Sequence, residues 1–363
     1  MRIAFYAPLK TPDHPVVSGD REMARLLMRA LRLAGHAVDL VSDLRAYLRD
    51  NDEGLLADLL AAAAAETQRL GRAFAASPPP DIWFTYHPYY KSPDLLGPFL
   101  CARLGIPYVT AESSWSARRG GGAWGEAQKR VAEAAGMAAV NVCFTRRDAA
   151  GLREGVPGAR IGMLAPFIDT AAFRAADTGR DAARLICVAM MRPGDKLASY
   201  RMLAQALANL RGRPWSLSIV GDGPCRAEVE ALFRPFGPDR VTMHGQMDKA
   251  GIAALLASAS IYVWPGCGEA FGLAYLEAQA AGLPVVAQAT AGVPEVVRDG
   301  RTGILVPEGD VEAFAAAIAR LLDDDAERRK LAINASAAVE AGHSLSAAAA
   351  GLAALLPQPA AVR

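Results

Sequence analysis

The chain has 363 residues, of which 52% are hydrophobic and 21% are charged, a balance typical of a folded protein and not of a disordered one. This length is sufficient for two domains of ordinary size. The formal net charge is +1, from 39 basic and 38 acidic residues, which argues against a nucleic-acid-binding protein because such proteins normally carry a basic excess.

Residues 1–8 are predicted to form a first buried strand and not a signal peptide. No apolar stretch reaches the roughly 18 residues of a membrane-spanning helix, so no membrane span is expected. The cysteines form no Cys-x-x-Cys pair and have no histidine at metal-ligand spacing, which favours reduced thiols in a cytoplasmic protein without a metal site. The five cysteines are Cys101, Cys143, Cys187, Cys225 and Cys267.

Short apolar runs alternate with helical patterns along the whole chain. In the first half, strands are predicted over residues 2–7, 37–41, 82–86, 108–110 and 140–144, with helices such as 21–34 and 55–70 between them. In the second half, strands are predicted over residues 185–190, 216–220, 241–244, 261–264 and 285–287. Alternating strands and helices indicate an α/β fold with parallel sheets covered by helices. The two series predict two Rossmann-like domains, and no Gly-x-Gly-x-x-Gly follows the first strand to suggest an NAD-dependent enzyme.

The helix predicted from residue 21 carries a row of arginines at three- and four-residue spacing. They are Arg21, Arg25, Arg29 and Arg32. A basic helix face can bind anionic lipid headgroups, which would bring the protein to the inner face of a membrane as a peripheral protein. An ordinary solvated face has the same pattern, so both interpretations stay open.

The most informative segment begins with the apolar run 261–264, followed by a glycine-rich turn and a helical pattern that ends near Gly282. Two carboxylates, Glu269 and Glu277, flank the start of this helix. A helix N-terminus offers unpaired N–H groups and a partial positive charge to an anion. Carboxylates beside it can accept hydrogen bonds from sugar hydroxyls. A site that holds a phosphate and a polyol together suits a nucleotide sugar.

Residues 265–307 resemble the carboxyl-terminal signature of family-4 retaining glycosyltransferases. The signature contains a Glu-x7-Glu pair with Phe-Gly inside it, matched by Glu269, Phe271, Gly272 and Glu277. It continues with Glu-Ala-x-Ala-x-Gly-x-Pro-Val-Val at 277–286, Gly-x-Pro-Glu-Val-Val at 292–297 and a final piece at 299–307. A pair of acidic residues at this spacing is common, whereas the whole ordered string is specific.

The resemblance implies the GT-B fold, in which two Rossmann-like domains face each other across a cleft and a C-terminal helix crosses back to the first domain. Residues 1–170 are then the N-terminal acceptor-side domain, and residues 171–342 are the nucleotide-sugar-binding domain. Residues 343–356 form the returning helix, and a disordered tail is predicted over 357–363.

The resemblance places most of the donor site in the second domain. Arg192 and Lys196 are expected to clamp the donor diphosphate, because fixed cations stabilise the charge that a departing diphosphate gains. Their spacing is four residues, where the family usually has five. Glu269 is expected to bind hydroxyls of the donor sugar, and Glu277 those of the ribose. Further donor contacts are expected at Gly19, Gly221 and Gly245 and at the backbone of Phe271, Gly272 and Leu273.

The first domain departs from the family pattern at Glu112, which stands where many members have a histidine close to the reacting centre. A carboxylate here can bind a sugar hydroxyl, help an acceptor hydroxyl to lose its proton, indicate a different donor sugar, or mark lost activity. His87 is an acceptor-site candidate, and a structural role for it is equally open. Arg118 and Arg119 are candidates for contact with an anionic acceptor such as a lipid phosphate, with a solvated loop as the alternative.

The expected function is that of a retaining glycosyltransferase. It would move a hexose-type sugar from a nucleotide-diphosphate donor to a hydroxyl of a glycan or lipid-linked acceptor, with no cofactor and no obligatory metal, since no Asp-x-Asp cluster is placed to bridge a metal and a diphosphate. An inactive GT-B binding or scaffold protein and a GT-B nucleotide-sugar epimerase remain as alternatives.

Overall fold

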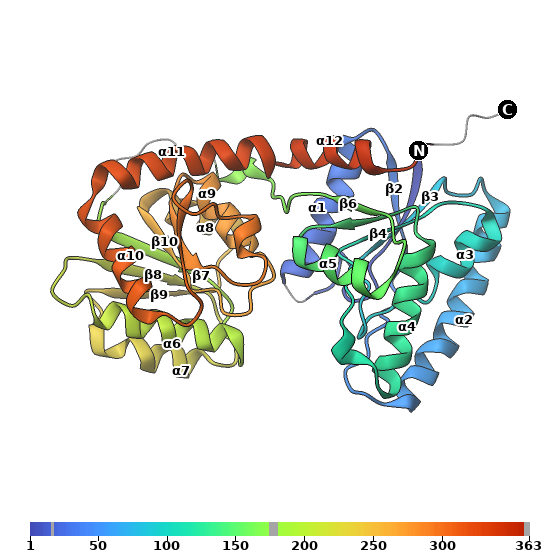
Figure 1. Ribbon diagram of the computed structural model, residues 1–363, viewed down its shortest axis with the longest axis horizontal. Helices are drawn as coiled ribbons and strands as arrows, with labels where there is room; N and C mark the ends of the chain where they lie inside the picture. Colours follow the sequence, from blue (N-terminus) through green and yellow to red (C-terminus); the bar gives the residue numbers. More distant parts are fainter. Residues whose placement is uncertain (16–17, 174–180, 359–363) are drawn as a thin grey trace. The chain divides into compact units, whose positions relative to one another are not determined.

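The computed structural model describes residues 1–15, 18–173 and 181–358, and these divide into two compact units (Figure 1). Unit 1 comprises Met1–Ala165 and resumes at Leu345, and unit 2 is Pro166–Ser344. The division thus falls between Ala165 and Pro166, whereas the sequence suggested residue 170. Most of the predicted tail, at 359–363, lies outside the described residues.

Unit 1 contains a six-stranded parallel sheet in the order β2-β1-β3-β4-β5-β6. Its strands are β1 (Arg2–Tyr6), β2 (Ala37–Ser42), β3 (Ile82–Tyr86), β4 (Tyr108–Ala111), β5 (Val140–Cys143) and β6 (Ile161–Met163). Strand β3 is buried at every position, as expected for an inner strand covered by helices on both faces. Strand β6 was not predicted from the sequence because only Gly162 of its three residues is buried, so no apolar run marks it.

The helices of unit 1 begin with α1 (Gly19–Leu33), where the Ser18 hydroxyl accepts a hydrogen bond from Arg21 N at 3.3 Å and caps the N-terminus. The others are α2 (Glu53–Ala76), α3 (Gly97–Leu104), η1 (Ala117–Arg119), α4 (Gly122–Met137), α5 (Arg146–Gly155) and α12 (Leu345–Leu355). Helix α12 packs against α1, so the C-terminal helix completes unit 1 (Figure 1).

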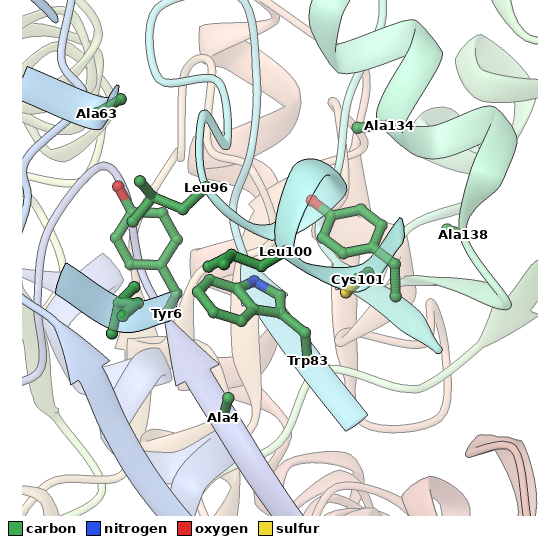
Figure 2. Packing of buried hydrophobic residues seen from close by; sticks show 11 residues of the cluster. Ala4, Tyr6, Ala63, Trp83, Leu96, Leu100, Cys101, Ala134 and Ala138 are labelled. Carbon is green, nitrogen blue, oxygen red and sulfur yellow. The ribbon is translucent and has the colours of Figure 1, made fainter. Parts of the chain in front are cut away.

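The core of unit 1 gathers aromatic side chains around a buried carboxylate. Tyr6 and Trp83 pack with Leu100 in one cluster (Figure 2). Tyr108 belongs to the same cluster. Asp94 lies in the same region and accepts hydrogen bonds from Trp83 Nε1 at 3.2 Å and Tyr108 Oη at 3.0 Å. These donors offset the cost of burying a carboxyl group.

Unit 2 contains a second six-stranded parallel sheet, in the order β12-β11-β10-β7-β8-β9. Its strands are β7 (Arg184–Val188), β8 (Ser216–Val220), β9 (Val241–Gly245), β10 (Ile261–Val263), β11 (Val285–Gln288) and β12 (Gly303–Val306). Strand β12 starts at a glycine because a Cβ there would lie 2.2 Å from the Val285 carbonyl oxygen of the next strand. The sequence predicted ten strands, and the described residues form twelve, with β6 and β12 the two that were missed.

The helices of unit 2 cover both faces of this sheet. They are η2 (Thr170–Ala172), α6 (Asp195–Ala208), α7 (Arg226–Phe233), η3 (Arg234–Phe236), α8 (Lys249–Ser258), α9 (Leu273–Ala280), η4 (Val293–Glu295), α10 (Val311–Asp323) and α11 (Asp325–Gly342). Helices α6 and α9 each begin close to the end of a sheet strand, β7 and β10 respectively, and they supply the charged residues of the site described below.

The chain passes between the units twice, at Ala165–Pro166 and at Ser344–Leu345. The residues of unit 2 next to these two points are joined by hydrogen bonds. Ile168 N donates to the His343 carbonyl at 2.9 Å, and His343 Nδ1 lies 2.6 Å from the Pro166 carbonyl oxygen. Because a carbonyl only accepts hydrogen bonds, Nδ1 carries the proton. Burial lowers the pKa of His343, which keeps this imidazole neutral at physiological pH.

Within the described ranges, no helix has the length and apolar character needed to cross a membrane. The same ranges contain no group of three or more His, Cys, Asp or Glu side chains suited to hold a metal ion. The five cysteines are free thiols, and all except Cys267 are buried. Burial raises the pKa of the Cys143 thiol to about 12, which makes it unreactive at neutral pH.

Candidate functional site

The glycine-rich turn between β10 and α9 has a left-handed backbone conformation at three positions, which favours glycine. Gly266, Gly268 and Gly272 have φ angles of +73°, +62° and +80°. A Cβ at Gly266 would lie 2.1 Å from Tyr275 Oη, and one at Gly272 would lie 2.6 Å from the same ring. Tyr275 is buried and donates to the Trp264 carbonyl at 3.1 Å, so the turn is folded closely over a fixed ring. Helix α9 then starts without a side-chain cap.

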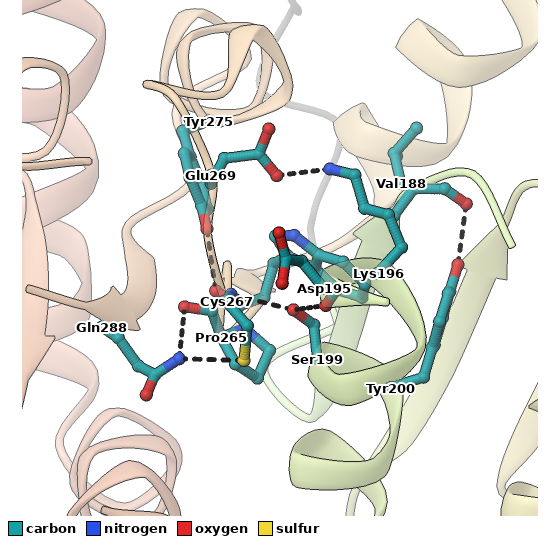
Figure 3. Close-up of polar contacts among 12 residues, drawn as sticks. Val188, Asp195, Lys196, Ser199, Tyr200, Pro265, Cys267, Glu269, Tyr275 and Gln288 are labelled. Carbon is teal, nitrogen blue, oxygen red and sulfur yellow. Dashed lines mark hydrogen bonds and ion pairs between the residues drawn. The ribbon is translucent and has the colours of Figure 1, made fainter. Parts of the chain in front are cut away.

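Glu269 in this turn forms an ion pair with Lys196, which comes from the first turn of α6 (Figure 3). The two side chains are 18% and 25% exposed, so a ligand can reach both. The ammonium also lies 5.7 Å from the centre of the Trp264 ring, at cation–π distance. The sequence predicted both residues for the donor site, and the structure brings them into direct contact although 73 positions separate them.

Two polar side chains that the sequence did not single out hold the turn against α6 and β11. Ser199 Oγ accepts a hydrogen bond from Cys267 N at 2.9 Å and donates to the Asp195 carbonyl at 2.9 Å. Gln288 donates to the Pro265 carbonyl at 3.2 Å and to Cys267 Sγ at 3.3 Å (Figure 3). No motif marks either residue, because each contact depends on how distant elements pack.

Glu277 lies on α9 and is half-buried. Its charge and that of Glu269 both act on Tyr262, whose pKa is raised well above its usual range mainly by burial and additionally by these carboxylates. The Tyr262 hydroxyl donates to the Val188 carbonyl at 3.1 Å. Both predicted carboxylates therefore lie within electrostatic range of Tyr262, whose hydroxyl is bound at the end of β7.

Arg192 was predicted to bind the diphosphate together with Lys196, but it lies outside the ion pair of Lys196 and Glu269. It is exposed in the loop before α6, and its carbonyl accepts a hydrogen bond from Leu197 N at 3.1 Å. In the part of the chain that the structure describes, its side chain makes no ion pair. Of the two cations predicted to bind a diphosphate, Lys196 alone is paired with Glu269.

Gly221 and Gly245 lie side by side at the ends of β8 and β9, where Gly221 N donates to the Gly245 carbonyl at 2.8 Å. At Gly221, where φ is +147°, a Cβ would come within 1.9 Å of the Ala189 carbonyl oxygen. A Cβ at Gly245 would come no closer than 3.4 Å to Arg226. Gly19, the first residue of α1, has nothing within 4 Å of a Cβ position. The chain's own backbone thus requires glycine at 221, and no contact among the described residues requires it at 19.

Two residues of unit 1 adopt the left-handed conformation that non-glycine residues rarely enter. His87 follows β3 with φ +60°, and Glu112 follows β4 with φ +56°. The His87 amide donates to the Ala111 carbonyl at 2.8 Å, and the Glu112 amide donates to the Val142 carbonyl at 2.8 Å. Such strain costs on the order of 1–3 kcal/mol at each residue and concentrates at functional sites.

The charged side chains near His87 and Glu112 shift each other's pKa values. Burial would lower the pKa of His87, but Glu112 and Asp20 outweigh it and raise the value to about 9. His87 Nδ1 lies 3.3 Å from Asp20 Oδ1, at ion-pair distance. Burial raises the pKa of Glu112 to about 7, against the opposing effect of His87. The Asp20–His87 pair was missed in the sequence, although Asp20 directly follows Gly19.

Two polar atoms at the end of β4 are buried and have no hydrogen-bond partner among the described residues: Glu112 Oε2 and Ser113 Oγ. Glu112 is only 8% exposed. Since buried polar groups are nearly always satisfied, such atoms indicate a place where a ligand or water binds.

The basic residues proposed for lipid or acceptor contact have varied surroundings. Arg21 and Arg25 donate to loop carbonyls, Arg21 Nη1 to His14 at 3.0 Å and Arg25 Nε to Pro12 at 2.6 Å. These two guanidinium groups therefore serve to hold the loop before α1. Arg118 and Arg119 are exposed in η1, and Arg119 lies 4.6 Å above the Tyr90 ring.

Solved structures show the class of fold. Sucrose-phosphate synthase from Thermosynechococcus elongatus superposes with a TM-score of 0.74 over 98% of both chains, at 22% sequence identity. Anabaena HepE in complex with UDP-glucose gives a TM-score of 0.70 over 98% of this chain and 100% of that chain, at 16% identity. With two parallel six-stranded sheets, the chain has the expected α/β fold of two Rossmann-like domains, of the GT-B type.

Sequence comparison shows which proteins the second half of the chain is similar to. Residues 182–324 match the family model described as Glycosyl transferases group 1. Alpha-D-kanosaminyltransferase of Streptomyces kanamyceticus is 33% identical over 214 residues, 56% of this chain and 55% of that protein. D-inositol 3-phosphate glycosyltransferase of Kribbella flavida is 36% identical over 187 residues, 48% of this chain and 43% of that protein. The chain spans about half the length of these curated relatives. Residues 182–324 are thus similar to the glycosyltransferases of group 1, in agreement with the resemblance to family-4 glycosyltransferases seen in the sequence.

Proposed function

We propose that the protein is a retaining glycosyltransferase that moves a hexose-type sugar from a nucleotide diphosphate to a hydroxyl acceptor. The observation that carries the proposal is the ion pair of Glu269 and Lys196 beside the glycine-rich turn and the uncapped start of α9. The pair supplies an acceptor for sugar hydroxyls and a cation for a diphosphate in one place. The relatives named above are transferases of sugars, which supports the same class of reaction.

Unit 2 binds the donor in this proposal. Lys196 and Arg192 contact the diphosphate, the backbone at the start of α9 adds N–H donors, and Glu277 accepts hydrogen bonds from the ribose. Glu269 turns from Lys196 to hydroxyls of the donor sugar. The two cations provide the charge stabilisation that a metal ion provides in other transferases, so no metal is required.

The transfer itself breaks the bond between the anomeric carbon and the diphosphate oxygen, and the electron pair leaves with the diphosphate. The acceptor hydroxyl oxygen forms the new bond on the same face, which retains the anomeric configuration. Its proton passes to the leaving diphosphate or to Glu112, whose Oε2 has no hydrogen-bond partner among the residues that the structure describes. His87, which is positively charged at neutral pH, then fixes the position of Glu112 through their opposite charges.

The test is a thermal-shift panel of UDP-, GDP- and ADP-sugars, beginning with UDP-glucose because the fold neighbour HepE is described in complex with it. One nucleotide sugar is expected to raise the Tm of the wild type, and the shift should persist in EDTA. Glu269→Ala should remove the extra rise in Tm that the nucleotide sugar gives over the bare nucleotide. Glu308→Ala, an exposed carboxylate of unit 2, should leave that gain intact. If no nucleotide sugar changes the Tm, the proposal fails.

An inactive GT-B binding protein is the second candidate, favoured by Glu112 in the place of the family's histidine. It would bind a nucleotide sugar without releasing nucleoside diphosphate when acceptors are added. A transferase releases the diphosphate only with an acceptor present, whereas an epimerase converts the donor without one.

The pH dependence of transfer tests the role of Glu112. As a base it must be deprotonated, so the wild-type rate should rise as pH increases through about 7, the pKa of Glu112. Glu112→Gln keeps the size of the side chain and cannot accept the proton, so this step in the pH–rate profile should disappear. A profile that Glu112→Gln leaves unchanged would show that another group, such as the diphosphate, takes the proton.

A further inference from the structure

The imidazole of His87 is under the influence of carboxylates from three different elements of unit 1. Glu112 directly follows β4, Asp20 lies in the first turn of α1, and Asp148 lies in the first turn of α5. Each of these carboxylates raises the pKa of His87, and together they outweigh the effect of burial. The structure therefore stabilises the charged form of this imidazole.

Asp20 lies at ion-pair distance from the His87 ring. Its Oδ1 is 3.3 Å from His87 Nδ1, with 38% of the Asp20 side chain and 21% of the His87 side chain exposed. Burial would raise the pKa of Asp20, but His87 and Lys10 outweigh it and lower the value. Asp20 is therefore ionised at neutral pH, and Asp20 and His87 stabilise each other's charged forms.

Asp148 has a different task. Thr145 Oγ1 donates to Asp148 Oδ2 at 2.6 Å, and the Asp148 amide donates to the same hydroxyl oxygen at 3.0 Å. These reciprocal bonds hold the start of α5. Asp148 acts on His87 through charge alone and more weakly than Glu112 or Asp20 does.

The position of Asp20 is fixed by the start of α1. Ser18 Oγ accepts a hydrogen bond from Arg21 N at 3.3 Å and another from Lys10 Nζ at 2.9 Å. Asp20 is the second residue of this helix, where the partial positive charge of the N-terminus favours an ionised carboxylate. The charge that faces His87 is therefore in place before any ligand binds.

His87 is in turn connected to Glu112 through both backbone and charge. The His87 amide donates to the carbonyl of Ala111, the residue just before Glu112, and both His87 and Glu112 have a left-handed backbone. Burial raises the pKa of Glu112 to about 7, and the largest effect that opposes this rise is the charge of His87. Loss of the positive charge on His87 would therefore favour protonation of Glu112 and remove the attraction between the two side chains.

We propose that Asp20 is a positioning residue of the transfer reaction: it keeps His87 positively charged, and His87 holds the Glu112 carboxylate ionised and in place. This inference rests on the proposed function, in which Glu112 can accept the proton of the acceptor hydroxyl. Asp20 acts through His87 and needs no contact with either substrate. An aspartate that only stabilised the start of α1 would affect the stability of the protein and not the charge of His87.

The first arm of the test measures the charge of His87 in the free protein. The imidazole resonances are followed by NMR during a pH titration, and His87, one of five histidines, is assigned by the signal lost in His87→Gln. Asp20→Asn should lower the pKa of His87 by about one pH unit, the low end of the effect of a nearby opposite charge. Glu22→Gln is the matched control, since it removes a charge from the same turn of α1 and should leave this pKa unchanged.

The second arm measures transfer at pH 7 and pH 9. With the pKa of His87 one unit below its value of about 9, the charged fraction at pH 9 falls from about one half to about one tenth. Asp20→Asn should therefore transfer about fivefold more slowly than the wild type at pH 9 and at nearly the same rate at pH 7. Asp20→Glu, which keeps the charge, should restore most of the rate at pH 9.

The two arms separate failure of this inference from failure of the proposed function. An unchanged pKa of His87 in Asp20→Asn, or an equal change in Glu22→Gln, would overturn the inference whatever reaction the protein catalyses. A rate that falls equally at pH 7 and pH 9 would also overturn it, because loss of a structural contact has that effect. If no nucleotide sugar supports transfer, the proposed function fails, and the NMR titration still decides whether Asp20 sets the charge of His87.

Discussion

Replacing Lys196 with Ala is expected to lower the kcat of sugar transfer about 100- to 1,000-fold, the range seen when one fixed donor to a developing charge is removed. Lys196 is held beside Glu269 in the free protein, so its ammonium is already positioned when the donor arrives. A departing diphosphate gains charge in the transition state, and a preorganised cation stabilises that state more than the bound donor. Steady-state kinetics with the donor found by thermal shift would measure the loss.

The control for this variant is Lys330→Ala, which removes an exposed lysine of α11 and should leave kcat unchanged. The double variant Lys196→Ala/Glu269→Ala adds a sharper comparison. In the single variant the Glu269 carboxylate loses its partner and repels the diphosphate, so donor affinity falls for a second reason. Residues in contact give non-additive effects, and the double variant should bind the bare nucleotide better than Lys196→Ala does. If the effects of Lys196→Ala and Glu269→Ala on the free energy of nucleotide binding simply added in the double variant, the ion pair would have no role in donor binding.

Gly221→Ala is expected to destabilise unit 2 by about 3 kcal/mol or more, through an unfavourable backbone angle and steric overlap together. The added methyl group would lie 1.9 Å from the Ala189 carbonyl oxygen, which belongs to the backbone and cannot rotate away. Relief requires the ends of β7 and β8 to separate, and the end of β7 leads into the loop before α6. The urea midpoint of unfolding would measure the change, and nucleotide affinity should fall with it.

Gly300→Ala is the matched control for this second variant. Gly300 has φ +65° and no atom within 4 Å of a Cβ position, so alanine there meets an unfavourable angle and no overlap. Its cost should be about 1–2 kcal/mol, the penalty of a left-handed residue alone. If Gly221→Ala and Gly300→Ala lowered the free energy of unfolding equally, the backbone near Ala189 would have moved away from the new methyl group without strain.

The sequence predicted the fold well because the inner strands of parallel sheets are continuous apolar runs. Strand β3 was predicted at the bounds that the structure gives, 82–86. Strand β12 was missed because its short run follows a glycine that is needed for close approach to β11 and that interrupts the apolar pattern. Short outer strands carry too little buried surface to be recognised without their neighbours.

The candidate site also contains residues that a local sequence pattern marks and residues that only the packing of distant elements brings together. Glu269 and Glu277 belong to a local motif, so the sequence alone could single them out as candidates from consecutive residues. The contact of Lys196 with Glu269 and that of Asp20 with His87 join different elements, and their distances depend on how those elements pack. The left-handed angles of His87 and Glu112 carry no sequence mark, because neither residue type requires them.

The route of the chain restricts how the protein can be dissected. Helix α12 completes unit 1 but is reached only through all of unit 2. A gene truncated after Ala165 would encode a product whose α1 lacks the helix that covers part of its apolar surface, and such a product should aggregate. Joining residue 165 to residue 345 through a short linker, with 166–344 expressed separately, gives two polypeptides with intact cores. Donor and acceptor ligands could then be assigned to each polypeptide by direct titration.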